Sequence, residues 1–337
     1  MTTLEMPAER VYDTYRVRVD EYRLFREQGY LVVKGLVPPE DVHELNTTMD
    51  DMMAGKISLD DVHAQAGLGR KVMAPQDWLR VHMLHRRLPI FERYLLHPRV
   101  LDLLEALIGP DVLALQSMLF FKQPGQVGQG YHQDSYYIPT FPDTLCGAWL
   151  ALTPATQQNG CLWYAVGSQN EPIYPDPGGT GAALSSNIGD LGTIENASDC
   201  DESVNGLNRV VEKYADRIIP VEADPGDVVF FAGHVIHWSY TNQGSVPRRS
   251  YVGHYCNARS FVPWNHGEKW DGPSANYLHI LGRGQTHLAY AQPKFGTPCA
   301  ANAPRPADSA GAPAASMMGM DDDMMGPSLH STEPDDD

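Results

Sequence analysis

The sequence predicts a mostly β protein with flanking α-helices, whose core is an antiparallel barrel or a double-sheet jelly roll. After Val112 the chain consists of short runs rich in aromatic and β-branched residues, separated by turn signals such as Asn159-Gly160 and Asp224-Pro225-Gly226. Before Val112 the apolar residues recur mainly at helical spacing. Hydrophobic residues make up 42% of the 337 positions, which supports a sizeable core and excludes a wholly disordered or fibrous protein.

The N-terminal part, about residues 1–111, is expected to be helical with one strand. The first helix carries Tyr22 and Phe25, with Leu24 as a further candidate, on its apolar side, and Gly29 ends it. The expected elements are, in order, a helix over Val19–Gly29, a strand over Tyr30–Val37, a helix from Pro38 through Met49 and a helix over His97–Ile108.

The core is expected over about residues 112–260. A long segment over residues 170–216 interrupts it, and loops of that length are typically functional lids or partly disordered regions. All these elements fit a single domain over residues 1–300. The predicted strands cover Leu113–Lys122, Leu145–Leu152, Gly160–Val166, Arg217–Val221, Asp227–Tyr240 and Arg248–Cys256.

Residues 301–337 are expected to form a disordered acidic tail, because Ala, Pro, Ser, Met and Asp dominate their composition. This tail holds eight acidic residues against one basic residue, and therefore −7 of the net charge of −17. The remaining body is moderately acidic, which argues against nucleic acid or an anionic membrane as the default partner. The charge says little about the substrate, which we expect to be a small molecule.

The five cysteines are scattered and form no CxxC pair, which argues against a disulfide framework and favours a reducing compartment. The N-terminus has no apolar region typical of a secretory signal. No stretch approaches the roughly 18 uninterrupted apolar residues of a membrane span. We therefore expect a soluble, cytoplasmic protein, while the sequence says nothing of its oligomeric state.

The segment His132-Gln133-Asp134 is the first candidate for chemistry. On an extended strand the side chains of His132 and Asp134 would lie on one face, about 6.6 Å apart along the backbone. From there an imidazole and a carboxylate can converge on one metal ion. Such a pattern often arises by chance, so it needs support from elsewhere in the chain.

That support comes from the predicted strand over Asp227–Tyr240, which carries His234 and His237. If this strand and the next form a hairpin centred between Asn242 and Gln243, Arg248 faces His237. Ser239 then shares their face, and Arg249 points away. His234 would lie on the opposite face from His237, which favours His237 as the third ligand.

Two histidines and one carboxylate form the facial triad of non-haem Fe(II) oxygenases, which leaves coordination positions open. A nearby arginine fork suits a bidentate carboxylate of a ligand, such as a 2-oxo acid. Iron that binds a 2-oxo acid together with O₂ needs three such positions. The residues thus point to an oxygenase site.

These motifs resemble the phytanoyl-CoA dioxygenase-like family of Fe(II)/2-oxoglutarate oxygenases, over about residues 22–255. The resemblance rests on Tyr131-His132-Gln133-Asp134, on Asn159-Gly160-Cys161-Leu162 followed by Gly167-Ser168, and on His237-x-Ser239 with Arg248 eleven residues after the histidine. It also includes the opening helix and the strand that follows Gly29. One position departs from the family pattern, since Gln169 stands where the family usually has histidine.

The resemblance implies a double-stranded β-helix core and a dioxygenase that uses Fe(II), 2-oxoglutarate and O₂. It implies His132, Asp134 and His237 as iron ligands and Arg248 with Ser239 as the anchor of 2-oxoglutarate. Lys122 is a further candidate contact of the co-substrate or the substrate. Related halogenases lack the carboxylate ligand, so Asp134 favours hydroxylation or desaturation.

Two other functions remain open from the sequence alone. A zinc-dependent hydrolase could use the same ligands, although no general base stands out beside them. The other alternative is a jelly-roll binding protein without catalytic activity, in which we would expect at least one residue of the triad to be missing. Here every member of the triad is present.

Overall fold

The computed structural model describes residues 10–57, 64–65, 80–174, 207–262 and 279–298. The chain divides into one unit over Met1–Asn302 and a second over Ala303–Asp337, and all described residues belong to the first. The predicted tail and residues 175–206 of the predicted insert therefore lie outside the described residues. In the part of the chain that is described, no helix is long and apolar enough to cross a membrane.

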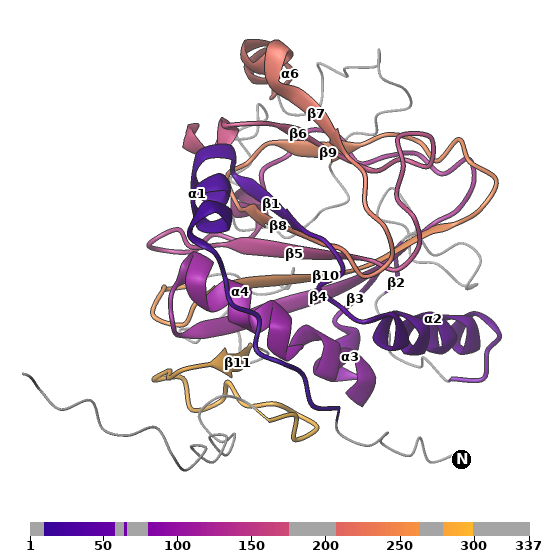
Figure 1. Cartoon of the computed structure of the whole chain (residues 1–337), viewed down its shortest axis with the longest axis vertical. Helices are drawn as coiled ribbons and strands as arrows, with labels where there is room; N and C mark the ends of the chain where they lie inside the picture. The colour runs from indigo at the N-terminus through magenta and orange to yellow at the C-terminus, as the bar shows by residue number, and fades with distance from the viewer. Residues whose placement is uncertain (1–9, 58–63, 66–79, 175–206, 263–278, 299–337) are drawn as a thin grey trace, which may run out of the picture. The chain divides into compact units, whose positions relative to one another are not determined.

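Two antiparallel sheets form the core of the described unit, and they face each other (Figure 1). The described part of the large sheet runs in the order β1 (Tyr30–Val33), β8 (Val228–Ala232), β5 (Cys146–Ala151), β10 (Arg248–Asn257), β4 (Val112–Lys122), β3 (Arg80–His82) and β2 (Ala64–Gln65), with β11 (Ile280–Arg283) also paired to β4. The small sheet has the order β7 (Ile218–Val221), β6 (Leu162–Ala165) and β9 (His237–Ser239).

The space between the sheets is filled by side chains from both. Met118, Trp149 and Val252 of the large sheet share one buried cluster with Tyr164 and Val221 of the small sheet. Two facing antiparallel sheets with a shared core are the jelly-roll arrangement, so the predicted fold class is confirmed.

In the described part of the chain, four helices cover the other face of the large sheet (Figure 1). They are α1 (Val19–Gln28), α2 (Pro39–Met53), α3 (Pro89–Leu95) and α4 (Pro98–Ile108). Two hydroxyls of β10 connect the sheet to α3, since Tyr251 donates to Phe91 O and Tyr255 to Leu95 O. Shorter helical segments are η2 (Leu84–Arg86), α5 (Asp134–Tyr137), η3 (Ser168–Asn170), α6 (Leu207–Val211) and η6 (Glu212–Arg217).

The first helix and strand differ from the prediction in two details. Phe25 is buried as expected, but Tyr22 and Leu24 are 42% and 38% exposed, because Glu21 takes the second inward position of α1. Strand β1 ends at Val33 rather than Val37. A turn follows, in which Gly35 has a left-handed φ of 58° and donates its N–H to Asp227.

The predicted strand over Asp227–Tyr240 is two strands, β8 and β9, which belong to different sheets. The predicted hairpin between this run and the next is also wrong. β9 pairs with β6, whereas Arg248 on β10 lies opposite Lys122 on β4. The chain crosses from the small sheet to the large one between β9 and β10, and hydrophobic periodicity cannot reveal such a change of sheet.

Candidate metal centre

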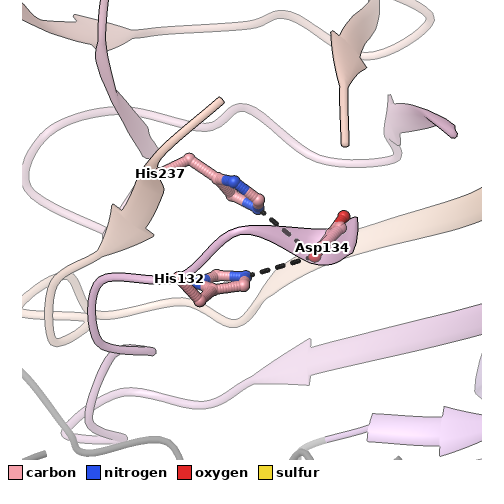
Figure 2. Close-up of side chains that lie close together, drawn as sticks. All are labelled: His132, Asp134 and His237. Atoms are coloured by element: carbon pink, nitrogen blue, oxygen red, sulfur yellow. Dashed lines mark ion pairs between the residues drawn. The ribbon is translucent and has the colours of Figure 1, made fainter. Parts of the chain in front are cut away.

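His132, Asp134 and His237 converge between the two sheets, as Figure 2 shows. One donor atom from each side chain lies within 4.8 Å of the other two. Asp134 Oδ1 is 3.5 Å from His132 Nε2 and 3.9 Å from His237 Nε2. No other group of His, Cys, Asp and Glu in the described residues comes together in this way.

The backbone sets the two histidines side by side. His132 and His237 form an isolated antiparallel bridge, in which each N–H donates to the carbonyl of the other over 3.1 Å. His132 is thus not part of a longer strand, and Asp134 begins helix α5, so the predicted extended strand is wrong. Gln133 between them is nonetheless extended, with φ −118° and ψ 126°, which keeps both side chains on one side.

Each imidazole is held with Nε2 available toward the centre. Nδ1 of His132 lies 2.8 Å from Gly130 O, and Nδ1 of His237 lies 3.1 Å from Val235 O. A carbonyl oxygen only accepts, so each Nδ1 carries the proton and Nε2 keeps a lone pair. Gln129 Nε2 lies 3.2 Å from His132 Nε2, at the edge of the same centre.

The charge states also suit a metal site. Burial, reinforced by the neighbouring His237, lowers the pKa of His132 to about 3. Burial likewise lowers the pKa of His237. Burial alone would raise the pKa of Asp134, but His254 and the two other histidines outweigh it and hold that pKa below its usual range. Neutral imidazoles and an ionised carboxylate are the forms that bind metal, and this donor set fits iron.

A second cluster lies on the inner face of the barrel and contains the other predicted site residues. Lys122 Nζ donates to Ser239 Oγ over 3.1 Å and also contacts the carbonyl of Tyr240. Arg248 lies directly opposite Lys122 in the strand register, and its Cζ stands 5.4 Å from the ring centre of Trp149. The structure therefore brings Arg248, Lys122 and Ser239 together although the hairpin used to predict this is wrong.

Both cations of this cluster are buried. Arg248 Nε and Nη1 have no hydrogen-bond partner among the described residues. Burial lowers the pKa of Arg248 to about 10. Burial, with the nearby Arg248, lowers the pKa of Lys122 well below its ordinary value. A buried guanidinium with unused donors is suited to a ligand carboxylate, which would pair its charge and accept its hydrogen bonds.

Three other residues considered in the sequence, His234, Arg249 and Gln169, lie outside the triad and outside the cluster around Arg248. His234 pairs with Asp143 through Nε2 and contacts Glu171 O through Nδ1, so it takes no part in the centre. Arg249 points outward and forms an ion pair with Asp50 over 2.7 Å. Gln169 donates to the carbonyls of Arg26 and Glu27 at the end of α1, away from the triad.

Besides Gln129, sequence reasoning missed two buried residues on the inner face of β10. His254 is not among the predicted site residues, but its Nε2 donates to Asp134 Oδ2 over 2.8 Å. Ser250 is fully buried on the same face of β10, and its Oγ has no partner among the described residues. Both residues are an even number of positions from Arg248, so strand alternation alone could have placed them on its face.

The family model described as phytanoyl-CoA dioxygenase (PhyH) matches residues 25–250 of this chain. The chain belongs to this family. Phytanoyl-CoA dioxygenase domain-containing protein 1 of Danio rerio is 28% identical over 288 residues, which cover 73% of this chain and 91% of the relative. The peroxisomal phytanoyl-CoA dioxygenase of Homo sapiens is 25% identical over 257 residues, which cover 73% of this chain and 70% of the relative.

Solved structures support the same fold. EctD from S. alaskensis with bound Fe is 17% identical with a TM-score of 0.57, and the match covers 87% of this chain and 88% of EctD. The non-heme alpha ketoglutarate dependent epimerase SnoN from nogalamycin biosynthesis is 17% identical with a TM-score of 0.56, covering 78% of this chain and 98% of SnoN.

Family membership identifies the chain as an oxidoreductase of the dioxygenase type. The donor set of His132, Asp134 and His237 fits the iron cofactor of such an enzyme. The buried cluster around Arg248 fits its dicarboxylate co-substrate, 2-oxoglutarate.

Proposed function

We propose that this chain hydroxylates a small organic molecule with Fe(II), 2-oxoglutarate and O₂. In this proposal His132, Asp134 and His237 hold the iron, and Arg248, Ser239 and Lys122 hold the far carboxylate of 2-oxoglutarate. The observation that carries it is the convergence of two Nε2 atoms and one carboxylate oxygen, with both Nδ1 atoms committed to backbone carbonyls.

The protein's part in this reaction is to bind, orient and exclude water. When bound, the iron and its co-substrates supply an oxidising centre that can hydroxylate a C–H bond, with succinate and CO₂ as the other products. Arg248 can donate two hydrogen bonds to a carboxylate, and Lys122 and Ser239 add donors beside it. The apolar cluster between the sheets keeps water from the inner end of the site. Asp134, a carboxylate in the place where related halogenases have none, favours hydroxylation over halogenation.

We also propose that the catalytic domain spans residues 1–300.

We further propose that it acts in the cytoplasm on a free small molecule rather than on nucleic acid or at a membrane. The scattered cysteines support a reducing compartment, and the moderately acidic body of the chain argues against nucleic acid or an anionic membrane. Cell fractionation against cytosolic and organelle markers tests the location, and enrichment in an organelle contradicts it.

The direct test of activity is succinate formation from 2-oxoglutarate with ferrous iron and ascorbate in air. We expect the wild-type chain to form succinate even without its substrate, and His132→Ala to lose at least about 100-fold of that rate because a ligand is gone. His43→Ala, which removes an exposed histidine on α2, serves as the control and should keep full activity. A wild-type chain that neither binds nor converts 2-oxoglutarate contradicts the proposal, and tightly held zinc in such a protein would favour the hydrolase.

Once succinate formation is established, a panel of metabolites can identify the substrate. We expect the true substrate to raise the rate of succinate formation and to gain the mass of one oxygen atom. A substrate that is consumed without gaining oxygen would point to desaturation or another oxidation instead of hydroxylation.

A further inference from the structure

The two oxygens of the Asp134 carboxylate have different surroundings. Oδ1 faces the Nε2 atoms of His132 and His237 at 3.5 and 3.9 Å. Oδ2 points to the other side, where it accepts a hydrogen bond from His254 Nε2 over 2.8 Å. One oxygen thus faces the metal centre, and the other is engaged by the large sheet.

The imidazole of His254 is itself fixed on its far side. His254 lies on the inner face of β10, opposite Gln116 of β4 and Gly147 of β5. Gln116 Nε2 lies 3.1 Å from His254 Nδ1, and both side chains are buried, at 2% and 4% exposure. An ionised carboxylate only accepts, so Nε2 of His254 carries a proton, and Nδ1 can then accept from the Gln116 amide.

A carboxylate can bind a metal through one oxygen or through both. With His132, Asp134 and His237 as its protein ligands, a bound iron would have three positions left for a bidentate 2-oxo acid and O₂. If Oδ2 of Asp134 also bound the metal, one of these positions would be lost. A charge-assisted N–H bond to Oδ2 opposes that rotation of the carboxylate.

We propose that His254, supported by Gln116, is a positioning residue that keeps Asp134 bound to the metal through Oδ1 alone and so preserves the coordination positions for 2-oxoglutarate. This inference rests on the proposed function, because it takes Asp134 as an iron ligand. It adds a role for two residues that contact no metal themselves.

The test compares His254→Leu, which removes the N–H donor, with His254→Gln, whose amide can still donate to Oδ2. Iron affinity is measured by anaerobic titration of the metal-free protein. Affinity of the iron-loaded protein for 2-oxoglutarate is followed by its visible charge-transfer absorption. X-ray absorption of the Fe(II) form reports the number of oxygen and nitrogen neighbours. Tyr255→Phe, which removes a buried hydroxyl on the opposite face of the same strand, controls for damage to β10.

We expect His254→Leu to weaken 2-oxoglutarate binding by about 10- to 100-fold, as is usual for the loss of a residue that orients a metal ligand. Its iron affinity should fall by less than that, because a second Asp134 oxygen can bind in compensation. His254→Gln should recover most of the 2-oxoglutarate affinity, and Tyr255→Phe should match the wild type. If His254 had a purely structural role, His254→Leu would lower the affinities for iron and for 2-oxoglutarate together, and His254→Gln would restore neither. That result would overturn the proposal.

Should His254→Leu fail to fold, Gln116→Leu provides the same comparison, since it loosens His254 without touching Asp134. We then expect weaker 2-oxoglutarate binding with iron affinity largely kept, and unchanged 2-oxoglutarate binding overturns the inference. If the wild-type chain itself shows no iron-dependent binding of 2-oxoglutarate, the proposed function fails and the inference falls with it. If the wild-type chain binds 2-oxoglutarate and His254→Leu binds it equally well, the proposed function stands and only the role of His254 is rejected.

Discussion

At the scale of single residues, the site depends on which face of a strand each side chain occupies. Arg248 and Arg249 are neighbours in sequence, yet their surroundings differ. Arg248 is buried, and two of its nitrogens have no hydrogen-bond partner among the described residues, whereas Arg249 pairs with Asp50 outside the barrel. Strand alternation predicts this contrast from the sequence alone, because it depends only on β10 itself. The prediction of the two faces therefore holds although the predicted hairpin is wrong.

This contrast allows a matched pair of variants. Arg248→Lys keeps the charge but loses the planar fork, so we expect the KM for 2-oxoglutarate to rise by about 10- to 100-fold, as the loss of a charge-assisted hydrogen bond of about 1.5–3 kcal/mol implies. Arg249→Lys makes the same substitution on the outer face of β10 and should leave this KM unchanged. Steady-state kinetics of succinate formation checks both, and equal effects of the two variants would exclude Arg248 as the anchor.

The contact between His254 and Asp134 marks the limit of residue-level prediction. Alternation places His254 on the inner face with Arg248, but it does not say which side chain on the other side of the barrel it meets. That depends on how the segment before α5 pairs with β9 of the small sheet, which involves residues far apart in the chain.

At the scale of elements, the turn between β8 and β9 positions His237. Gly233 N donates to Leu145 O, and Ser135 N donates to Gly233 O, so the turn is fixed against the segment that follows Asp134. A side chain at Gly233 would collide with Ser135 and Leu145. The sequence shows a continuous β-prone run here, because a single glycine in a strand pattern is a weak signal of a turn.

The Gly167-Ser168 motif holds the same turn from the small sheet. Ser168 is fully buried, and its Oγ accepts the N–H of Ile236 over 2.8 Å, next to the carbonyl of Val235 that fixes His237. The motif therefore has a structural role, since it binds the residue next to the proposed iron ligand His237. Its neighbour Gln169 instead binds the end of α1, so the departure from the family pattern is not part of the triad.

Ser168→Ala should consequently destabilise the fold and loosen His237. We expect a loss of about 1–3 kcal/mol in the free energy of unfolding, the usual cost of a buried N–H that loses its partner, together with weaker iron binding. Thr48→Ala removes a hydroxyl on α2 that, among the described residues, bonds only to Glu44 O of its own helix, and it should change the unfolding free energy much less. Denaturant unfolding of both variants is the measurement, and equal stability would show that Ser168 does not hold the turn.

At the scale of the whole catalytic unit, two sheets combine residues that are far apart in sequence. His132 lies before α5, His237 begins β9 of the small sheet, and Arg248 begins β10 of the large sheet. Composition and strand patterns predict the jelly roll and its helical cover. The pairing between strands is not predictable in the same way, because the order of strands across a sheet leaves no periodic trace in the sequence.

Joint spacing carries more information than any single motif. A lone His-x-Asp is common, but its combination with His237, Ser239 and Arg248 indicates the family from the amino-acid sequence alone. Spacing does not provide the donor atoms, the protonated nitrogens or the residues that orient them, and these depend on the three-dimensional arrangement of the side chains. The charge of the tail, by contrast, says nothing about this site.

The central claim is that His132, Asp134 and His237 form an iron site that is completed by 2-oxoglutarate. The most direct measurement is an anaerobic titration of the metal-free chain with Fe(II) in the presence of 2-oxoglutarate, followed by visible absorption. The account predicts a charge-transfer band that saturates at a single Fe(II) per chain and is lost in Asp134→Ala and His237→Ala, which should remain folded. A wild-type chain that binds Fe(II) without responding to 2-oxoglutarate, or a band that survives in both variants, would contradict it.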